Sequence, residues 1–361
     1  MGGGPRGTCC HGCKRGQGQH DETCLRAVSV LSDVQLALAW QQYEMEAYAE
    51  RQMEPARITG QMDIWDPVWG EFRCRQGQRP RYCDVLGFTC CPCIFVSCGW
   101  SGASGKEKAL AWQRFLLSWA VLFSMLQLLV MAILVAENGG IVSMAENPMM
   151  GPSVEILNDM GAKNFGLIVV EGEWWRLITP MMLHAGWLHF LMNVIAQLQM
   201  GVMLEVVWGH SAWLLIYCTC GIYASLASCA FSPNTLSVGA SGSLCGLVGA
   251  WFSFILITWN QTLPHDTAMR SGQIGSVVLT IALLAAMFPA KFIDHSAHGG
   301  GVVMGAALAS VLFAGRLQSR PWRIATRLLG VAFVVALWYG AWLLFADQSY
   351  ELFEHCLWPR C

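Results

Sequence analysis

Charged residues are scarce in this sequence. Only 13% of its 361 residues are Asp, Glu, Lys or Arg, whereas about 25% is usual in soluble chains. Hydrophobic residues make up 55%, and the mean hydropathy is +0.43. The net charge of −2 comes without the basic patches that nucleic acids require, so no nucleic-acid partner is expected. The scarcity of charge predicts a polytopic membrane protein whose surroundings are a lipid bilayer.

A secretory signal is also missing from the first residues. Residues 1–24 are polar, rich in Gly, Gln and Cys, and show no central apolar run. This composition favours disorder. Residues 25–54 then show apolar positions spaced by three and four, and Pro55 follows, which predicts an amphipathic helix. We expect residues 1–105 to form a cytosolic region ahead of the membrane domain.

Cysteines are concentrated in this region, with 10 of the 16 before residue 100. Two C-x-x-C pairs begin at Cys10 and Cys90, and two such pairs could bind zinc. However, they lie far apart for one site. The second pair and Cys98 come just before the first apolar run, where palmitoylation is common. Palmitoylation, zinc binding and unmodified thiols all remain open.

Seven apolar runs follow the cysteine-rich region. They cover about 115–136, 184–204, 211–231, 236–257, 275–289, 298–315 and 326–346. Basic residues gather before the first run and between the sixth and seventh, and such clusters face the cytoplasm. The chain is therefore predicted to be all-α, with a cytoplasmic N-terminus and a luminal or extracellular C-terminus.

This topology places three polar segments at one membrane face. The fourth and sixth runs cross in the same direction, so Ser241 and His298 lie at the same depth. The second run also opens there, with His184, His189 and Asn193. An ionisable residue inside a span indicates a functional site. The alternative is simple helix packing, because small residues such as those of GASG at 239–242 let helices approach closely.

The residue types at this face fit nucleophilic catalysis. A serine needs an adjacent base to take its proton, and a histidine can accept that proton and return it. We expect Ser241 to be the nucleophile and His298 the base. His189 and Asn193 are four apart and share one helix face, so with the Ser241 N–H they could stabilise an oxyanion.

Nearby polar residues have plainer interpretations. His184 is expected to hold a loop carbonyl rather than to take part in catalysis. Asp294 lies four before His298, which suggests a triad, although the polar loop needs a charge there anyway. Cys245 is expected to fill a small buried space.

These motifs resemble those of the rhomboid intramembrane serine proteases. EWWRLITPMMLHAGWLHFLMN resembles the WR motif followed by H-x-x-x-x-H-x-x-x-N, and GASG and AHGGGVVMG resemble the serine and histidine motifs. LEVVWG at 204–209 resembles the end of the second helix. The resemblance covers roughly 110–315 and implies a six-helix core at 106–320. A seventh helix within 321–361 then makes a six-plus-one arrangement, typical of eukaryotic secretase-type members.

The resemblance also implies an activity. Ser241 and His298 would form a dyad, His189 and Asn193 would bind the oxyanion, and neither metal nor cofactor would be needed. The supporting residues would be His184, Gly239, Gly242, Trp175 and Arg176. Substrates would be single-span membrane proteins cut near the outer leaflet. The alternative is a non-catalytic relative that binds membrane proteins or acts in their quality control. A Golgi or plasma-membrane location is favoured over mitochondria.

Overall fold

The structure is a computed structural model. It describes residues 113, 115–259, 274, 275, 277–282, 294–317 and 319–357, all within one of the chain's two units, residues 65–361. Within these residues the secondary structure is helical, apart from an isolated antiparallel bridge between Lys163 and Ser237. The predicted amphipathic helix and the cysteine pairs lie outside the described residues.

Long apolar helices dominate the described residues. Five are long and apolar enough to cross a membrane: α7 (Trp119–Glu137), α10 with its continuation (Trp187–Trp208), α12 (His210–Phe231), α15 with η7 (His295–Arg316) and α16 (Arg320–Leu357). Helix α13 (Ser241–Ile257) is apolar and shorter. The polytopic all-α prediction is confirmed. Because the fifth run, 275–289, is described only as far as residue 282, the six-plus-one count stays a prediction.

Helix α13 begins five residues later than the apolar run that predicts it. Residues 236–240 are not helical, and Ser237 exchanges both backbone hydrogen bonds with Lys163. Gly239 then adopts a φ of +121°, which interrupts any helix. Residues 236–239 are partly exposed and only Ala240 is buried, so the absence of charge in this stretch indicated neither helix nor full burial, and the start of the span was placed too early.

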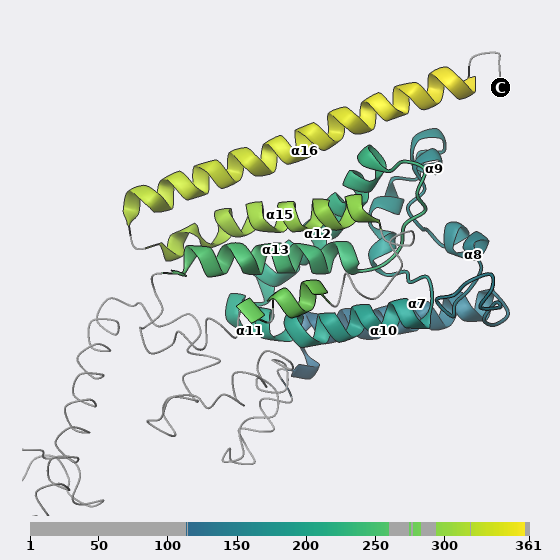
Figure 1. Ribbon diagram of the computed structural model, residues 1–361, viewed down its shortest axis with the longest axis horizontal. Coiled ribbons are helices and arrows are strands. Elements are labelled where there is room, and N and C mark those ends of the chain that lie inside the picture. The colour runs from purple at the N-terminus through teal and green to yellow at the C-terminus, as the bar shows by residue number, and fades with distance from the viewer. Residues whose placement is uncertain are drawn as a thin grey trace, which may run out of the picture. The chain divides into compact units, whose positions relative to one another are not determined.

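The helices pack into a bundle in which α13 lies against α12 and α15, while α16 crosses α15 on the outside (Figure 1). Helix α10 (Trp187–Ala196) continues through a π-helical turn, η3 (Gln197–Gly201), into α11 (Val202–Trp208). At this turn the buried Gln197 amide donates to Gln127, while the Tyr217 hydroxyl donates to Gln197. A polar network in hydrocarbon must satisfy itself internally, so these contacts hold α7, α10 and α12 together.

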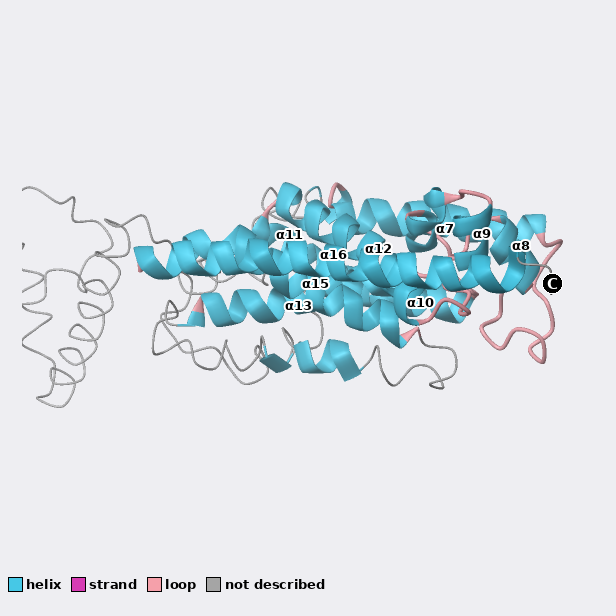
Figure 2. Cartoon of the chain, turned by 90° about the horizontal axis from the view of Figure 1, so that it is seen from above, coloured by secondary structure: helices cyan, strands magenta, loops and turns pink. Residues whose placement is uncertain are grey.

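The segment between α7 and α10 gathers at one end of the bundle (Figures 1 and 2). It contains the short helices α8 (Val154–Asp159), α9 (Phe165–Val170), η1 (Trp174–Leu177) and η2 (Thr179–Met181). Ser153 and Asn164 cap α8 and α9 through their side-chain oxygens. The Trp174 ring lies 6.3 Å from that of Trp342, so α16 also contacts this segment.

Candidate active site

Ser241 is the first residue of α13, and the chain just before it sets its position. The Gly239 N–H donates to the Pro180 carbonyl at 2.8 Å. A Cβ at Gly239 would lie 2.6 Å from the His189 ring, too close for any side chain. Glycine is therefore required at 239 for two reasons, its positive φ and the nearness of His189.

The contact between α13 and α15 is made by backbone against backbone. A Cβ added at Gly301 would lie 2.2 Å from the Gly242 carbonyl oxygen, and one at Gly305 would lie 1.9 Å from that of Gly246. The glycine spacing that suggested helix packing does produce close packing. This packing also brings the histidine of α15 to the serine of α13.

The two residues predicted as a dyad are in direct contact. His298 Nε2 lies 2.7 Å from Ser241 Oγ, within hydrogen-bond distance for proton transfer. Both side chains are partly buried rather than sealed. The arrangement can therefore remove the serine proton while leaving the oxygen accessible.

Three groups were predicted to stabilise an oxyanion: the Ser241 N–H, His189 and Asn193. The Ser241 N–H is among the first N–H groups of α13, since the first bond within the helix runs from Leu244 to Ala240. Such N–H groups carry the positive end of the helix dipole. His189 Nδ1 accepts the Ala185 N–H at 3.3 Å, so a neutral ring carries its proton on Nε2 as a donor.

Asn193 is the third group, one turn along α10 from His189. It is buried, and its Nδ2 donates to the His189 carbonyl at 2.8 Å. The amide NH₂ has a second N–H to offer. Its Oδ1 is buried without a hydrogen-bond partner among the described residues. A buried polar atom without a partner is unusual and is consistent with a site that changes partners during a reaction.

The supporting residues have structural contacts. His184 is fully buried and packs edge-on against His189 and Phe190. The Arg176 guanidinium lies over the Trp175 ring at 4.6 Å and donates to the Asn158 and Ala162 carbonyls. Arg176 therefore ties together the segment before α10.

Asp294 has a role that the sequence interpretation missed. It is the N-cap of α15, and its Oδ1 accepts the Ala297 N–H at 2.9 Å. Its Oδ2 accepts the hydroxyl hydrogen of the fully buried Ser228, on α12. Both carboxylate oxygens thus fix the start of the helix that carries His298. An Asp just before an apolar run is an N-cap signal, but no sequence feature pointed to Ser228.

The buried Lys163 extends this network. Its Nζ donates to the Ser232 carbonyl at 3.0 Å, and the Ser232 hydroxyl lies 2.7 Å from that of Ser296. Burial lowers the pKa of Lys163, while the nearby Cys229 and Asp294 oppose that shift. The segment before α10, the end of α12 and the start of α15 are therefore held together around the dyad.

No group of three His, Cys, Asp or Glu side chains that could hold a metal ion occurs in the part of the chain that the structure describes. The cysteine pairs considered for zinc lie outside it, so that question and palmitoylation stay open.

Comparison with known proteins agrees with the motifs. Residues 171–315 match the Rhomboid domain family, a range that contains the serine, both predicted oxyanion residues and the histidine. The chain is 37% identical over 167 residues to the Arabidopsis thaliana RHOMBOID-like protein 6, mitochondrial, which covers 46% of this chain and 53% of that protein. It is 34% identical over 236 residues to the Bacillus subtilis rhomboid protease GluP, covering 65% of this chain and 43% of GluP.

Residues 171–315 of the chain form a domain of the rhomboid family. This confirms the resemblance to the rhomboid family, while the secretase-type subtype stays a prediction. The chain spans about half the length of the curated relatives it matches. The matched range ends at η7, so it excludes α16 and everything before residue 171.

Proposed function

We propose that this protein is an intramembrane serine endopeptidase that works through a Ser241–His298 dyad. The contact of 2.7 Å between His298 Nε2 and Ser241 Oγ carries the proposal. A rhomboid protease among the relatives supports the same class of reaction.

In the first half of the reaction, Ser241 Oγ attacks the carbonyl carbon of the scissile peptide while its proton passes to His298 Nε2. The negative charge on the carbonyl oxygen is stabilised by the Ser241 N–H, His189 and Asn193. His298 then gives the proton to the departing amine, and the C–N bond breaks. An acyl ester on Ser241 remains.

In the second half, His298 takes a proton from water, and the resulting hydroxide attacks the ester carbonyl. The C–O bond to Ser241 breaks, and the proton returns to Ser241 Oγ. The carboxylic acid product is released, and the dyad is restored. The partly buried site lies at one end of α13, so it is open to water without crossing the hydrocarbon core.

The proposed substrates are single-span membrane proteins cut near the face where α13 begins. A protease binds extended backbone, so the substrate helix must unwind locally, and small or helix-breaking residues favour this. We also propose a cytoplasmic N-terminus and a Golgi or plasma-membrane location. The name of one relative places that relative in mitochondria. Imaging of a tagged full chain against markers of each membrane tests the location.

The test is cleavage of a co-expressed single-span substrate by the wild-type chain, Ser241→Ala and His298→Ala. Both variants should reduce cleavage by on the order of 10⁴-fold or more, to background. A fluorophosphonate probe should label the wild type at Ser241 and fail to label His298→Ala. If the protein is instead a non-catalytic binder, its effect on the partner persists in Ser241→Ala, and the probe labels neither form.

A further inference from the structure

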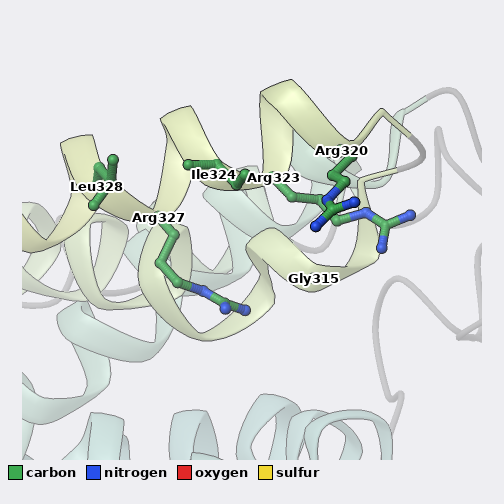
Figure 3. Close-up of a pocket in the computed structure, with 6 residues that line it drawn as sticks. All are labelled: Gly315, Arg320, Arg323, Ile324, Arg327 and Leu328. Atoms are coloured by element: carbon green, nitrogen blue, oxygen red, sulfur yellow. The ribbon is translucent and has the colours of Figure 1, made fainter.

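A cavity of about 330 Å³ lies where α15 ends and α16 begins. His298 is in the first turn of α15, so the cavity is at the other end of that helix. Figure 1 shows the junction between α15 and α16. Figure 3 shows the arginines that line it. The six lining residues include no acidic side chain; they are Gly315, Arg320, Arg323, Ile324, Arg327 and Leu328. The cavity is therefore strongly positive and partly apolar.

Contacts hold the arginines around the cavity. Arg323 Nε donates to the Leu317 carbonyl at 2.5 Å, which orients its guanidinium. Arg327 lies over Gly315, where an added Cβ would be 3.6 Å from Arg327 Nη2. A guanidinium offers N–H groups in a planar fork that matches the oxygens of a phosphate.

The cavity lies at the depth of lipid headgroups. The span from His295 to Arg316 has 22 residues, so it is about 33 Å long at 1.5 Å per residue. This length matches the hydrocarbon core of about 30 Å. Trp322, 67% exposed, follows directly and is typical of a membrane interface.

Apolar side chains complete the site. Ile324 and Leu328 are one helical turn apart and are both exposed, so they face lipid beside the arginines. A free phosphate has no apolar surface to pack against these two residues, whereas a phospholipid carries a glycerol and acyl chains that would cover them. Basic clusters at membrane faces also set topology. Topology depends on the number of basic residues, however, and does not require them to line a cavity.

We propose that this cavity binds the phosphate group of an anionic phospholipid, with Arg320, Arg323 and Arg327 on the phosphate and Ile324 and Leu328 against the glycerol and acyl chains. The occupant bridges the last turn of α15 and the first turns of α16. The proposal does not depend on the proteolytic activity.

The experiment uses the full chain purified in a neutral detergent, with native mass spectrometry to measure the affinity for added phosphatidylglycerol and for phosphatidylcholine with the same acyl chains. The wild type should bind one phosphatidylglycerol more tightly than phosphatidylcholine. Each arginine near an anionic surface contributes about five-fold in affinity, so Arg320→Gln, Arg323→Gln and Arg327→Gln together should weaken binding by about 10²-fold. Equal affinity for the two lipids overturns the proposal.

Two controls separate the alternatives. Lys106→Gln, Lys108→Gln and Arg114→Gln together remove as many charges from the sequence before the first apolar run and should leave the affinity unchanged. An equal loss means that general charge, not the cavity, binds the lipid. The corresponding triple Arg→Lys variant should lose at least about ten-fold because lysine lacks the fork. Wild-type affinity in that variant overturns the proposed geometry.

Three further measurements complete the test. Gly315→Leu fills the cavity without changing charge, so it should abolish tight binding even if the triple Gln variant fails to fold. Inorganic phosphate should not displace the lipid at equal concentration, and Ile324→Ala with Leu328→Ala should weaken lipid binding by several-fold. If phosphate alone binds as tightly as the lipid, the ligand is free phosphate and the lipid assignment is wrong.

Discussion

Helix α15 meets α13 and α16 in different ways. Against α13, Gly301 and Gly305 leave no room for a Cβ, because the facing carbonyl oxygens would be 2.2 and 1.9 Å away. Against α16, a Cβ at Gly330 would come no closer than 3.0 Å, to a Val311 methyl. Of the five candidate spans among the described residues, α16 is the least buried: 17% of its apolar stretch is buried inside the protein.

The difference indicates that the geometry of the α13–α15 contact must be held closely, whereas that of the α15–α16 contact can vary slightly. The two residues of the dyad lie on α13 and α15, and proton transfer between them tolerates only displacements well under 1 Å. The contact with α16 joins no two predicted catalytic groups. We therefore expect the first contact to control activity and the second to affect mainly stability.

Among substitutions at the two helix contacts, the largest effect is expected from Gly305→Ala. The new methyl forces α13 and α15 apart and displaces His298 from Ser241, so cleavage should fall by about 10²-fold or more. Cleavage rates in proteoliposomes and thermal unfolding measure the effect. Gly299→Ala is the matched control, because a Cβ at Gly299 has nothing within 4 Å. Equal loss in both variants would contradict the role given to the helix contact.

Lowering the pH should distinguish the two ends of α15. Histidine titrates near neutral pH and acts as a base only when neutral, so cleavage should fall about ten-fold per pH unit below its pKa. The arginines at the other end stay charged, so phosphatidylglycerol binding should not change. A cleavage rate that is constant from about pH 8 to about pH 5 would argue against His298 as the base.

Asp294→Ala should have a moderate effect. It removes the N-cap of α15 and the partner of Ser228, which should cost about 0.5–2 kcal/mol of stability and reduce cleavage several-fold. Asp294→Asn keeps a capping oxygen and should restore most of the activity. If Asp294 were a triad member, the Asn variant should instead lose about 10⁴-fold. Cleavage rates and unfolding midpoints of both variants decide between the two roles.

The smallest effect is expected from Gly330→Ala, at the contact between α15 and α16. Small shifts of Val311 and Ser310 can accommodate the methyl group, so activity should stay within about two-fold and stability within about 1 kcal/mol. The same cleavage and unfolding assays apply. A loss as large as that of Gly305→Ala would remove the distinction between the two contacts.

Much of the helix pattern was predictable, because hydropathy alone dictates which segments can lie in lipid. Six of the seven predicted runs are helices within the described residues. Their ends were less accurate. Helix α16 extends for 38 residues where a run of about 21 was expected, because the chain stays helical both before the apolar segment, from Arg320, and after it, to Leu357.

Contacts between distant residues were not predictable in the same way. The π-helical turn at Gln197–Gly201 and the pairing of Asp294 with Ser228 depend on how neighbouring helices face one another. Serine and glutamine are common in helices, and nothing in their local spacing identifies a partner 66 residues away.

The sequence by itself determined the class of protein, the apolar segments and the residue types available for chemistry, because composition and local spacing carry that information directly. Only the tertiary structure decided that Ser241 and His298 touch, that His189 lies beside Gly239, and that three arginines surround one cavity. Those outcomes depend on the distance between helices, and that distance is set by side-chain volume and packing across the bundle.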